Sequence, residues 1–501
     1  MCGIAGFLNA RTAAFPADAA RISAAMNRSL QHRGPDDEGI WVDAEAGVSL
    51  IHRRLSIVDL SPAGHQPMVS ADGRFVITYN GEIYNFPDLR KDLESRGVNF
   101  RGESDTEVML ESIARLGLHA TLPALVGMFA MALWDRRERT LTLIRDRLGI
   151  KPLYWAKFGE LFLFGSELKA LRAHPGWTPR IDRSAVASFM RYNYIPAPHT
   201  IYQGVHKLEP GTMLTLPWGG EPKIERYWDA RAVAREGMRD PLGGSDSELL
   251  GQLETLLQDA VRRRMIADVP LGAFLSGGID STTVVALMQS ANVGKVRTFT
   301  VGFAEADYDE APHAAAIARH LGTEHNELTV TAQQALDVIP QLPEWFDEPF
   351  ADSSQIPTHL ISALTRQHVT VALSGDGGDE LFAGYNRYRL ATRLWRNLTL
   401  LPLPLRSALA RFATAISPAT WTNQLARLPG PRMPGQIGDK IHKAANLLGE
   451  RDSGGLYRQL VTHWNPAIVA PGVAETQGVL FDKAIDGEFP DLLSRMQFLD
   501  L

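Results

Sequence analysis

A single cysteine stands at position 2, directly after the initiator methionine. A thiol attacks an amide only as its thiolate, or with a base that takes its proton. Initiator methionine is usually removed before a small residue, so we expect Cys2 to become the first residue. Its own α-amine, with an ordinary pKa of roughly 7.7–8.0, then serves as the base. For Cys2 taken alone, an incidental cysteine near a terminus is a competing interpretation.

A glycine-rich segment at residues 276–281 (SGGIDS) has the composition of a phosphate-binding loop. Glycines let the backbone approach phosphate oxygens, and the N-terminus of the following helix offers free N–H groups. Ser276 and Ser281 add hydroxyl donors, whereas Asp280 repels phosphate and is expected to hold Mg²⁺. The segment is not a Walker A loop, because no Gly-Lys-Ser/Thr follows. A plain Gly-Gly turn before a helix fits the spacing about equally well.

A third polar cluster lies on an expected loop before a helix. It contains Asp347, Glu348 and Asp352, followed by Ser353 and Ser354. The cluster is a candidate pocket for the acceptor of a group transfer. An N-cap with acidic residues in the first helical turn explains the same residues equally well, so both interpretations stay open.

The elements that must position these groups differ between the two halves of the chain. In the first half, β-rich runs bounded by Gly/Pro turns lie at residues 48–59, 74–80, 128–135, 140–145 and 160–165. This pattern predicts packed antiparallel sheets. A helix is expected to begin after Ser104, which forms a capping-box pair with Glu107.

In the second half, β-runs alternate with helical stretches. The β-runs lie at residues 269–275, 296–303 and 369–373, and the helices at 280–289 and 311–321. Such alternation predicts a parallel, doubly wound sheet, which binds ligands at the carboxyl ends of its strands.

Residues 381–451 are expected to form a basic helical subdomain. This segment contains eleven Lys and Arg residues but only two Asp and Glu residues. Leu405, Leu409 and Phe412 share one helical face there, with Arg406 beside them. We expect a solvated basic face, with a membrane-surface or partner-binding face as the alternative.

Composition narrows the class of protein. With 501 residues, of which 45% are hydrophobic and 22% charged, the chain is an ordinary globular protein of two or more domains. The net charge of −6 argues against general nucleic-acid binding. No long apolar run or secretory signal is visible, and one cysteine allows no intrachain disulfide, so a cytoplasmic location is expected.

Five segments of the first half occur in the order of a known domain. They are residues 1–6 (MCGIAG), 32–36 (HRGPD), 54–57 (RLSI), 80–85 (NGEIYN) and 104–107 (SDTE). Together they resemble the class II glutamine amidotransferase domain, an N-terminal-nucleophile hydrolase with a four-layer αββα fold. The resemblance covers roughly the first 210 residues. It implies that Cys2 releases ammonia from glutamine.

The resemblance also assigns roles around Cys2. Asn80, through its side-chain amide, and Gly81, through its backbone N–H, match the family's donors to the oxyanion, although Asn-Gly is also a common hairpin turn. Arg54 suits the α-carboxylate of glutamine. Glu82 and Asp105 suit its α-ammonium, and Asp105 also favours the dipole of its helix. Residues 32–36 read as a turn and receive no catalytic role.

The second half resembles the ATP pyrophosphatases, which cleave ATP between its α and β phosphates. Residues 276–281 match their SGGxDS loop, and residues 374–380 (SGDGGDE) look like the family's SGEGSDE segment. The resemblance places Asp379 opposite Asp280 as a second Mg²⁺ ligand. The family often has Glu where this chain has Asp376, whose role stays open. Nucleotide contacts are implied at Leu275, Ser276, Gly277, Gly278, Asp280, Ser281, Val301, Ser374 and Gly375.

The whole chain is similar to the glutamine-hydrolysing asparagine synthetase family. We expect an amidotransferase domain at residues 1–216, a linker at 217–246 and a synthetase domain at 247–501. The resemblance implies that ATP converts a carboxylate, aspartate by default, into an acyl-adenylate that ammonia attacks after a shielded passage between the domains. It also implies a homodimer.

Two alternatives stay open for the reaction, and a third is disfavoured. Relatives of this type amidate other carboxylates, such as uronic acids of surface polysaccharides or peptide carboxylates. β-Lactam synthetases share the architecture but lack the cysteine, so Cys2 argues against them. The family continues past the Phe-Leu-Asp-Leu pattern at residues 498–501 to a Lys-Val-Asp-Arg segment whose lysine serves adenylation. We therefore expect either a shortened chain or an incomplete synthetase half, which would leave a glutaminase or regulatory protein.

Overall fold

The computed structural model describes residues 1–10, 18–292, 294–303, 309–425, 437–465, 471–473, 475 and 478–501. The chain forms two compact units. The first contains Met1–Phe189 and Asn193–Asp376, and the second contains Met190–Tyr192 and Gly377–Leu501. Each unit is described by itself.

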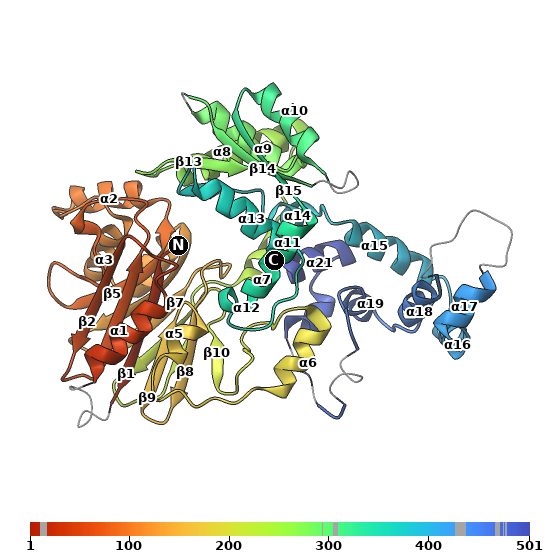
Figure 1. Ribbon diagram of the computed structural model, residues 1–501, viewed down its shortest axis with the longest axis horizontal. Coiled ribbons are helices and arrows are strands. Elements are labelled where there is room, and N and C mark those ends of the chain that lie inside the picture. Colours follow the sequence, from red (N-terminus) through yellow and green to blue (C-terminus); the bar gives the residue numbers. More distant parts are fainter. Residues whose placement is uncertain are drawn as a thin grey trace. The chain divides into compact units, whose positions relative to one another are not determined.

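The N-terminal part of the first unit is built on two six-stranded antiparallel sheets (Figure 1). The first sheet contains, in spatial order, β10 (Val205–Lys207), β8 (Tyr154–Phe158), β9 (Leu161–Gly165), β1 (Gly3–Asn9), β3 (Val48–Arg54) and β2 (Asp37–Asp43). The second contains β12 (Lys223–Arg226), β11 (Thr212–Pro217), β7 (Thr140–Arg145), β6 (Gly127–Asp135), β5 (Phe75–Ile83) and β4 (Met68–Val69).

Side chains alternate along these strands and build three apolar layers. Ile4 of β1 packs between the two sheets against Trp134 of β6, whereas its neighbour Ala5 faces outward toward Met26. The outer face of the first sheet is covered by α1 (Ala19–Ser29), α5 (Leu168–Arg172) and α6 (Arg183–Tyr192). The outer face of the second is covered by α2 (Phe86–Ser95), α3 (Asp105–Leu116) and α4 (Leu118–Thr121). This order of layers confirms the αββα prediction.

The rest of the first unit contains a four-stranded parallel sheet, which confirms the α/β prediction. Its strands are, in spatial order, β15 (Glu324–Val330), β14 (Arg297–Phe303), β13 (Leu271–Phe274) and β16 (Val371–Leu373). The other elements of this part of the unit are α7 (Ala230–Arg239), α8 (Asp246–Arg264), α9 (Ile279–Ala291), α10 (Ala311–Leu321), α11 (Ala332–Val338), α12 (Leu342–Trp345) and α13 (Gln355–Arg366). Val261, Met288 and Ala318 bring α8, α9 and α10 into the apolar core of this sheet.

The second unit is helical, as expected. Among the described residues, its α-helices are α14 (Gly378–Phe382), α15 (Asn386–Leu398), α16 (Leu403–Ala415), α17 (Pro418–Leu425), α18 (Ile437–Leu448), α19 (Ser453–Leu460) and α21 (Leu492–Asp500). The carboxylate of Asp500 ties three of them together, because it accepts hydrogen bonds from Tyr388 and Tyr457.

The apolar row on α16 is exposed, since 65% of Phe412 is accessible to solvent. Its neighbour Arg406, however, is buried and donates to the carbonyl oxygen of Glu450. The expectation of a solvated basic face is therefore wrong for this arginine, which is held inside the subdomain. Whether the row binds a membrane or a partner stays a prediction.

Several predicted boundaries need correction. The strand predicted at residues 48–59 ends at Arg54, and β12 and α7 lie within the predicted linker, where β12 pairs with β11. Ser104 caps α3 as predicted, through the backbone N–H of Glu107. The reciprocal bond of a capping box is replaced, because the Glu107 carboxylate accepts from the backbone of residues 101 and 102.

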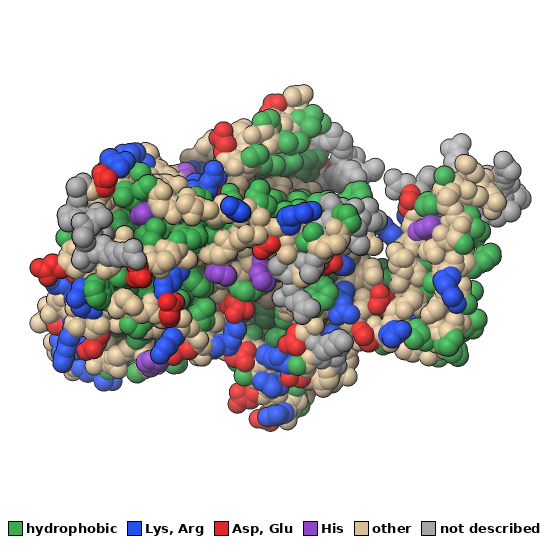
Figure 2. All heavy atoms as spheres, turned by 90° about the horizontal axis from the view of Figure 1, so that it is seen from below, with side chains coloured by type: hydrophobic (Ala, Val, Ile, Leu, Met, Phe, Trp, Pro, Cys, Tyr) green, Lys and Arg blue, Asp and Glu red, His purple; other side chains and the backbone are tan. Residues whose placement is uncertain are grey.

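The described helices include none long and apolar enough to cross a membrane. On the face drawn in Figure 2, Lys and Arg side chains are interspersed with Asp and Glu. The mixture is consistent with the small net charge of the chain.

Candidate active sites

Cys2 precedes β1 and lies at the edge of a small pocket in the first unit. The pocket is lined by Cys2, Arg54, Leu55, Ile57, Val58, Gly64, Gln66, Tyr79, Gly81, Glu82, Ser104, Asp105 and Thr106. The Cys2 Sγ lies 3.4 Å from the backbone nitrogen of Leu55, which donates to it. The predicted residues Arg54, Gly81, Glu82 and Asp105 therefore share one pocket with the predicted nucleophile.

Burial changes the acid–base chemistry at the chain start. It lowers the pKa of the Met1 α-amine to about 6. The nearby Cys2 raises this pKa, whereas the cations Arg33 and Lys151 lower it further. Burial also raises the pKa of the Cys2 thiol. The thiol therefore needs a base to become a thiolate, and the Met1 α-amine, with its lowered pKa, is neutral at pH 7.

Asn80 carries an unused hydrogen-bond donor. The residue is 1% exposed, and its Nδ2 has no partner among the described residues. A buried amide without a partner is costly in a folded protein, so such a group suggests a ligand that it binds. At the adjacent Gly81, a Cβ would collide with the carbonyl oxygen of Met128. Position 81 therefore has no room for a side chain, and Gly81 lines the pocket with its backbone.

Two carboxylates, the buried Asp105 and the partly buried Glu82, make the pocket attractive to a cation. Asp105 accepts hydrogen bonds from the Tyr79 hydroxyl at 2.8 Å and from the Ile83 backbone nitrogen at 2.9 Å. Burial, followed by repulsion from Asp105, raises the pKa of Glu82 well above its usual value. Burial also raises the pKa of Asp105 against those hydrogen bonds. An ammonium group bound here would relieve the repulsion.

Arg54 lies at the other side of the pocket and is fixed by the backbone. Its guanidinium donates to the carbonyl oxygens of Asp59 and Ser61. A Cβ on Gly64 would collide with the same guanidinium, so glycine makes room for it. These contacts orient Arg54 without neutralising its charge, which suits binding of a carboxylate.

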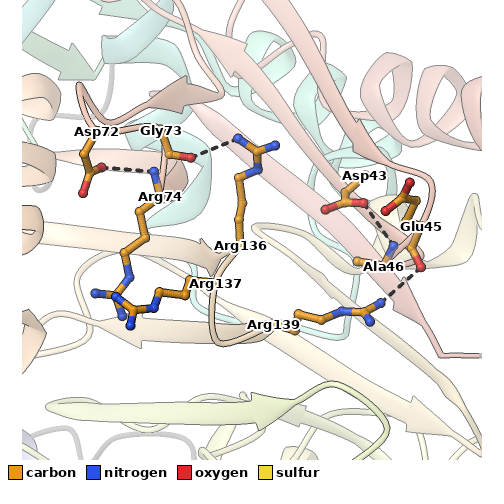
Figure 3. A pocket seen from close by; sticks show the side chains of 9 residues that line it. All are labelled: Asp43, Glu45, Ala46, Asp72, Gly73, Arg74, Arg136, Arg137 and Arg139. Atoms are coloured by element: carbon orange, nitrogen blue, oxygen red, sulfur yellow. Dashed lines mark hydrogen bonds between the residues drawn. The ribbon is translucent and has the colours of Figure 1, made fainter.

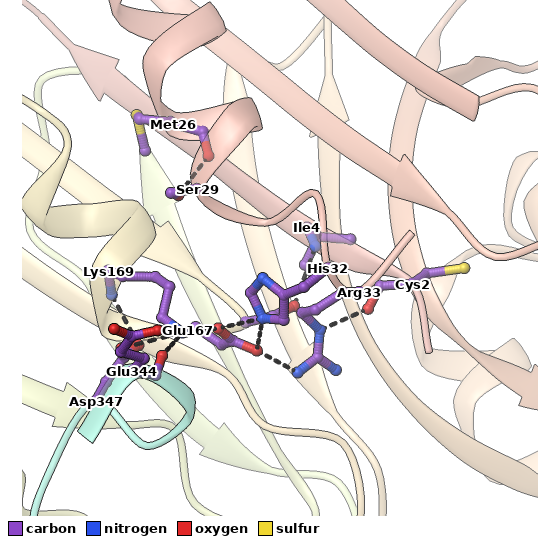
Figure 4. Close-up of polar contacts among 11 residues, drawn as sticks. Cys2, Ile4, Met26, Ser29, His32, Arg33, Glu167, Lys169, Glu344 and Asp347 are labelled. Carbon is purple, nitrogen blue, oxygen red and sulfur yellow. Dashed lines mark hydrogen bonds and ion pairs between the residues drawn. The ribbon is translucent and has the colours of Figure 1, made fainter. Parts of the chain in front are cut away.

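Sequence reasoning missed Arg33, which lies in the segment to which it assigned no catalytic role. The Arg33 Nε donates to the carbonyl oxygen of Cys2 over 2.9 Å, and its Nη1 lies 2.8 Å from Glu167 (Figure 4). The sequence did contain one indication of a role for Arg33, because it lies in the HRGPD segment, one of the five segments that resemble the amidotransferase domain.

The predicted nucleotide loop follows β13 and precedes α9. Gly277 has a positive φ of 83°, a conformation that favours glycine. The Ser276 and Ser281 hydroxyls lie 3.0 Å apart across the loop. Leu275, Ser276 and Val301 line one cavity of about 180 Å³ at the carboxyl ends of β13 and β14, as expected for a ligand site in a parallel sheet.

The second glycine-rich segment begins directly after β16, which pairs with β13. A Cβ on Gly375 would lie 2.7 Å from the backbone nitrogen of Ser281 and 3.0 Å from the Cβ of Asp280. Gly375 is therefore required for the close approach of the two segments. Ser374 donates to Asp376 over 2.9 Å. Asp379 lies on α14 in the second unit, so its expected place opposite Asp280 stays a prediction.

The acidic cluster is divided between two environments. Asp347 and Glu348 form ion pairs with Lys169 and Lys207 of the amidotransferase half. Asp352 is exposed and caps the backbone nitrogen of Ser354 at 2.8 Å. These contacts do not test the acceptor prediction, but they show that Asp347 and Glu348 join the two halves of the first unit.

A separate cavity of about 430 Å³ lies at the hairpin ends of the amidotransferase half (Figure 3). Arg136 and Arg139 line it and donate to the carbonyl oxygens of Gly73 and Glu45, while Arg74 pairs with Asp135. These arginines tie neighbouring hairpins together.

The fold and the Cys2 pocket define a class of protein, an amidotransferase joined to a synthase. Residues 1–228 match the family described as glutamine amidotransferase domain, and residues 252–501 match asparagine synthase. The chain belongs to the glutamine-hydrolysing asparagine synthetase family. Members of this family use ATP, glutamine and a carboxylate.

Three relatives support this assignment. Asparagine synthetase (glutamine-hydrolysing) 1 of Bacillus subtilis is 33% identical over 503 residues, which cover 100% of this chain and 75% of the relative. The putative enzyme of Mycobacterium tuberculosis is 34% identical over 529 residues, covering 100% and 76%. The putative enzyme 2 of Methanocaldococcus jannaschii is 36% identical over 413 residues, covering 78% and 77%.

Proposed function

We propose that the protein makes an amide from a carboxylate, aspartate by preference, with ammonia that Cys2 releases from glutamine and with ATP as the source of energy. The observation that carries the proposal is the Cys2 pocket. It combines a cysteine at the chain start, an orienting arginine and two carboxylates that favour a cation. These groups match the three functional groups of free glutamine.

In the first half-reaction, the Cys2 Sγ attacks the side-chain amide carbon of glutamine, and the α-amine takes the thiol proton. Asn80 Nδ2 and the Gly81 N–H stabilise the oxyanion. The intermediate collapses to a thioester, and the nitrogen leaves as ammonia with the proton from the amine. Water then hydrolyses the thioester to glutamate. Arg54 holds the α-carboxylate of glutamine throughout.

In the second half-reaction, an oxygen of the acceptor carboxylate attacks the α-phosphorus of ATP, and pyrophosphate leaves. The phosphate oxygens of the pyrophosphate group are bound by the backbone N–H groups around Gly277 and Gly278 and by the hydroxyls of Ser276 and Ser281. Ammonia then attacks the acyl carbon, AMP leaves, and the nitrogen loses a proton.

Asp280, in the first turn of α9, is the carboxylate that would hold Mg²⁺ with phosphate oxygens and water, and we propose Asp379 as its companion. A carboxylate next to phosphate-binding N–H groups fits such a site, because Mg²⁺ is commonly held by one or two carboxylates. The ion supplies neutralisation of the pyrophosphate charge.

Ammonia must reach the acceptor before water protonates it, so we propose a shielded passage between the two halves. We propose that Asp347, Glu348 and Asp352 line one side of the acceptor pocket. The expected homodimer is a further proposal, resting on the family alone.

The test is ATP–pyrophosphate exchange by the full-length protein with aspartate and a series of sugar acids, alongside glutamate release. We expect exchange that depends on aspartate, and a Cys2→Ala variant that keeps exchange but releases no glutamate. Exchange that occurs only with a sugar acid would show that the acceptor is a sugar acid and not aspartate. Glutamate release without exchange on any acid would favour the glutaminase or regulatory alternative. Undiminished glutamate release by Cys2→Ala would disprove the role of the nucleophile.

A further inference from the structure

Lys151 is a buried lysine to which the first half-reaction has assigned no role. It lies in the loop between β7 and β8 and is 4% exposed. Its ammonium forms no ion pair with any residue that the structure describes. A buried ammonium without a counter-ion is costly in a folded protein. The position of Lys151 therefore needs an explanation in the function of the protein.

The Lys151 ammonium points toward the start of the chain. Its Nζ donates to the Sδ of Met1 over 3.3 Å, and within the described part of the chain this is its one hydrogen bond. A thioether is a weak acceptor for a group that carries three donors. Met1 is also the residue that is expected to be removed. Its removal takes this acceptor away, and the ammonium then faces the space beside the new α-amine of Cys2.

The loop around Lys151 is fixed by hydrogen bonds to its backbone. The buried Asp146 carboxylate accepts from the backbone nitrogens of Phe129 at 3.1 Å and Lys151 at 2.9 Å. Arg145 donates to the carbonyl oxygens of Gly149 at 2.6 Å and Lys151 at 2.9 Å. Because Asp146 is occupied by backbone N–H groups, it orients the lysine but does not pair with its ammonium.

The other charged groups around the chain start leave Lys151 as the strongest cation there. Arg33 is already ion-paired with a carboxylate. Arg366 of α13 is exposed, so solvent and salt screen its charge. The carboxylates Glu82 and Asp105 face Cys2 from the pocket side, but burial raises the pKa of both, which weakens their negative charge at neutral pH.

We propose that Lys151 is a positioning residue for glutamine hydrolysis, whose ammonium disfavours protonation of the Cys2 α-amine and so keeps this base ready for the thiol proton. The inference rests on the proposed function, in which that amine takes the proton of Cys2. Burial is the largest cause of the lowered pKa at the chain start, and the charges of Arg33 and Lys151 add to it. An ordinary α-amine, with a pKa of roughly 7.7–8.0, would be mostly protonated at pH 7.

Lys157 offers a matched control. It is a partly buried lysine on β8, six residues along the chain, with a side chain that is 21% exposed. Its ammonium pairs with Glu221 at 2.6 Å and donates to the carbonyl oxygen of Gly220. These contacts lead away from Cys2. Lys157→Met therefore removes the same charge from the same strand region without changing the surroundings of the α-amine.

The experiment compares the full-length parent with Lys151→Met, Lys151→Arg and Lys157→Met. Mass spectrometry first establishes that Met1 is absent from each protein. The pH profile of kcat is then measured at saturating glutamine, because the glutamine KM also carries the titration of Glu82 and Asp105. The rate of alkylation by iodoacetamide is a second readout that needs no glutamine, and it reports on Cys2 alone because the chain has one cysteine.

We expect the acidic limb of both profiles to move up by about 0.5–1 pH unit in Lys151→Met, which lowers kcat about two- to fivefold at pH 6 and hardly at all at pH 8.5. Lys151→Arg should keep most of the parent profile, and Lys157→Met all of it. Thermal stability should not fall in Lys151→Met, because the substitution removes a buried charge without a counter-ion. Lys151→Gln replaces Lys151→Met if that protein does not fold.

Three outcomes overturn the role of Lys151. They are an acidic limb that stays in place in Lys151→Met, a loss of kcat that is equal at all pH values, and the same shift in Lys157→Met. The Cys2→Ala variant separates the two proposals. If it releases glutamate as fast as the parent, the proposed function fails at its nucleophile. If its glutamate release is lost while Lys151→Met keeps the parent profile, only the role of Lys151 fails.

Discussion

The guanidinium of Arg33 donates a hydrogen bond of 2.9 Å to the carbonyl oxygen of Cys2. The bond fixes the backbone from which the predicted nucleophile projects. Arg33→Lys keeps the positive charge near Glu167 but loses the planar fork that serves both partners. We expect kcat for glutamine hydrolysis to fall about 10- to 100-fold with little change in KM, because the nucleophile is misplaced while the glutamine pocket is intact. A rise in KM at unchanged kcat would instead place Arg33 in glutamine binding.

Asn80→Ala separates catalysis from stability. Loss of one oxyanion donor should lower kcat for glutamine hydrolysis by about 10²–10³-fold at nearly constant KM. The fold should lose little stability, because Asn80 Nδ2 has no partner to lose among the described residues. Steady-state kinetics and chemical denaturation on the same preparations test both statements. A large loss of stability with unchanged kcat would show that the side chain is structural.

The glutamine KM should fall as pH rises through the raised pKa values of Glu82 and Asp105. Only the deprotonated carboxylates attract the α-ammonium of glutamine. For stability the sign is opposite. Groups with raised folded pKa values stabilise the free protein fully below their unfolded values of 4.5 and 3.8, and lose that contribution as pH rises. Asp105→Asn should raise KM and flatten its pH profile, and an unchanged profile would contradict the assignment.

Gly375→Ala should impair the nucleotide site alone. The added Cβ would lie 2.7 Å from the Ser281 backbone nitrogen and would push the two glycine-rich segments apart. We expect the KM for ATP in the exchange reaction to rise at least tenfold, with glutamine hydrolysis in the absence of ATP unchanged. Gly251→Ala on α8 is the matched control, because its Cβ meets nothing within 4 Å. Equal effects of both substitutions would exclude a role for close packing at Gly375.

Local sequence patterns were sufficient for the framework of the fold. The strand at residues 140–145 and the helix at 311–321 agree with β7 and α10 to the residue. The predictions did not include β2 or β15, whose charged residues hide the β pattern. Each of these strands exists because it pairs with a neighbour, and pairing is not a local signal.

The role of a site residue was predictable where the chemistry requires a particular residue type, as at Cys2. It was not predictable where the role depends on a contact with a residue that is distant in sequence. By composition alone, Asp347 could be a ligand of the acceptor or an acidic residue at the N-terminus of a helix. Its contact with Lys169 spans 178 residues of sequence, so no local pattern could have indicated it. The same holds for Arg33 and Glu167, which are 134 residues apart.

Nitrogen transfer within one protein molecule tests the central claim most directly. The full-length protein is given glutamine labelled with ¹⁵N in its side-chain amide, ATP and aspartate, in the presence of excess unlabelled ammonium. Mass spectrometry then measures the ¹⁵N content of the product amide. The account predicts that most of the product carries ¹⁵N, and that Cys2→Ala makes only unlabelled product. An unlabelled amide from the unaltered protein, or a labelled amide from Cys2→Ala, would contradict it.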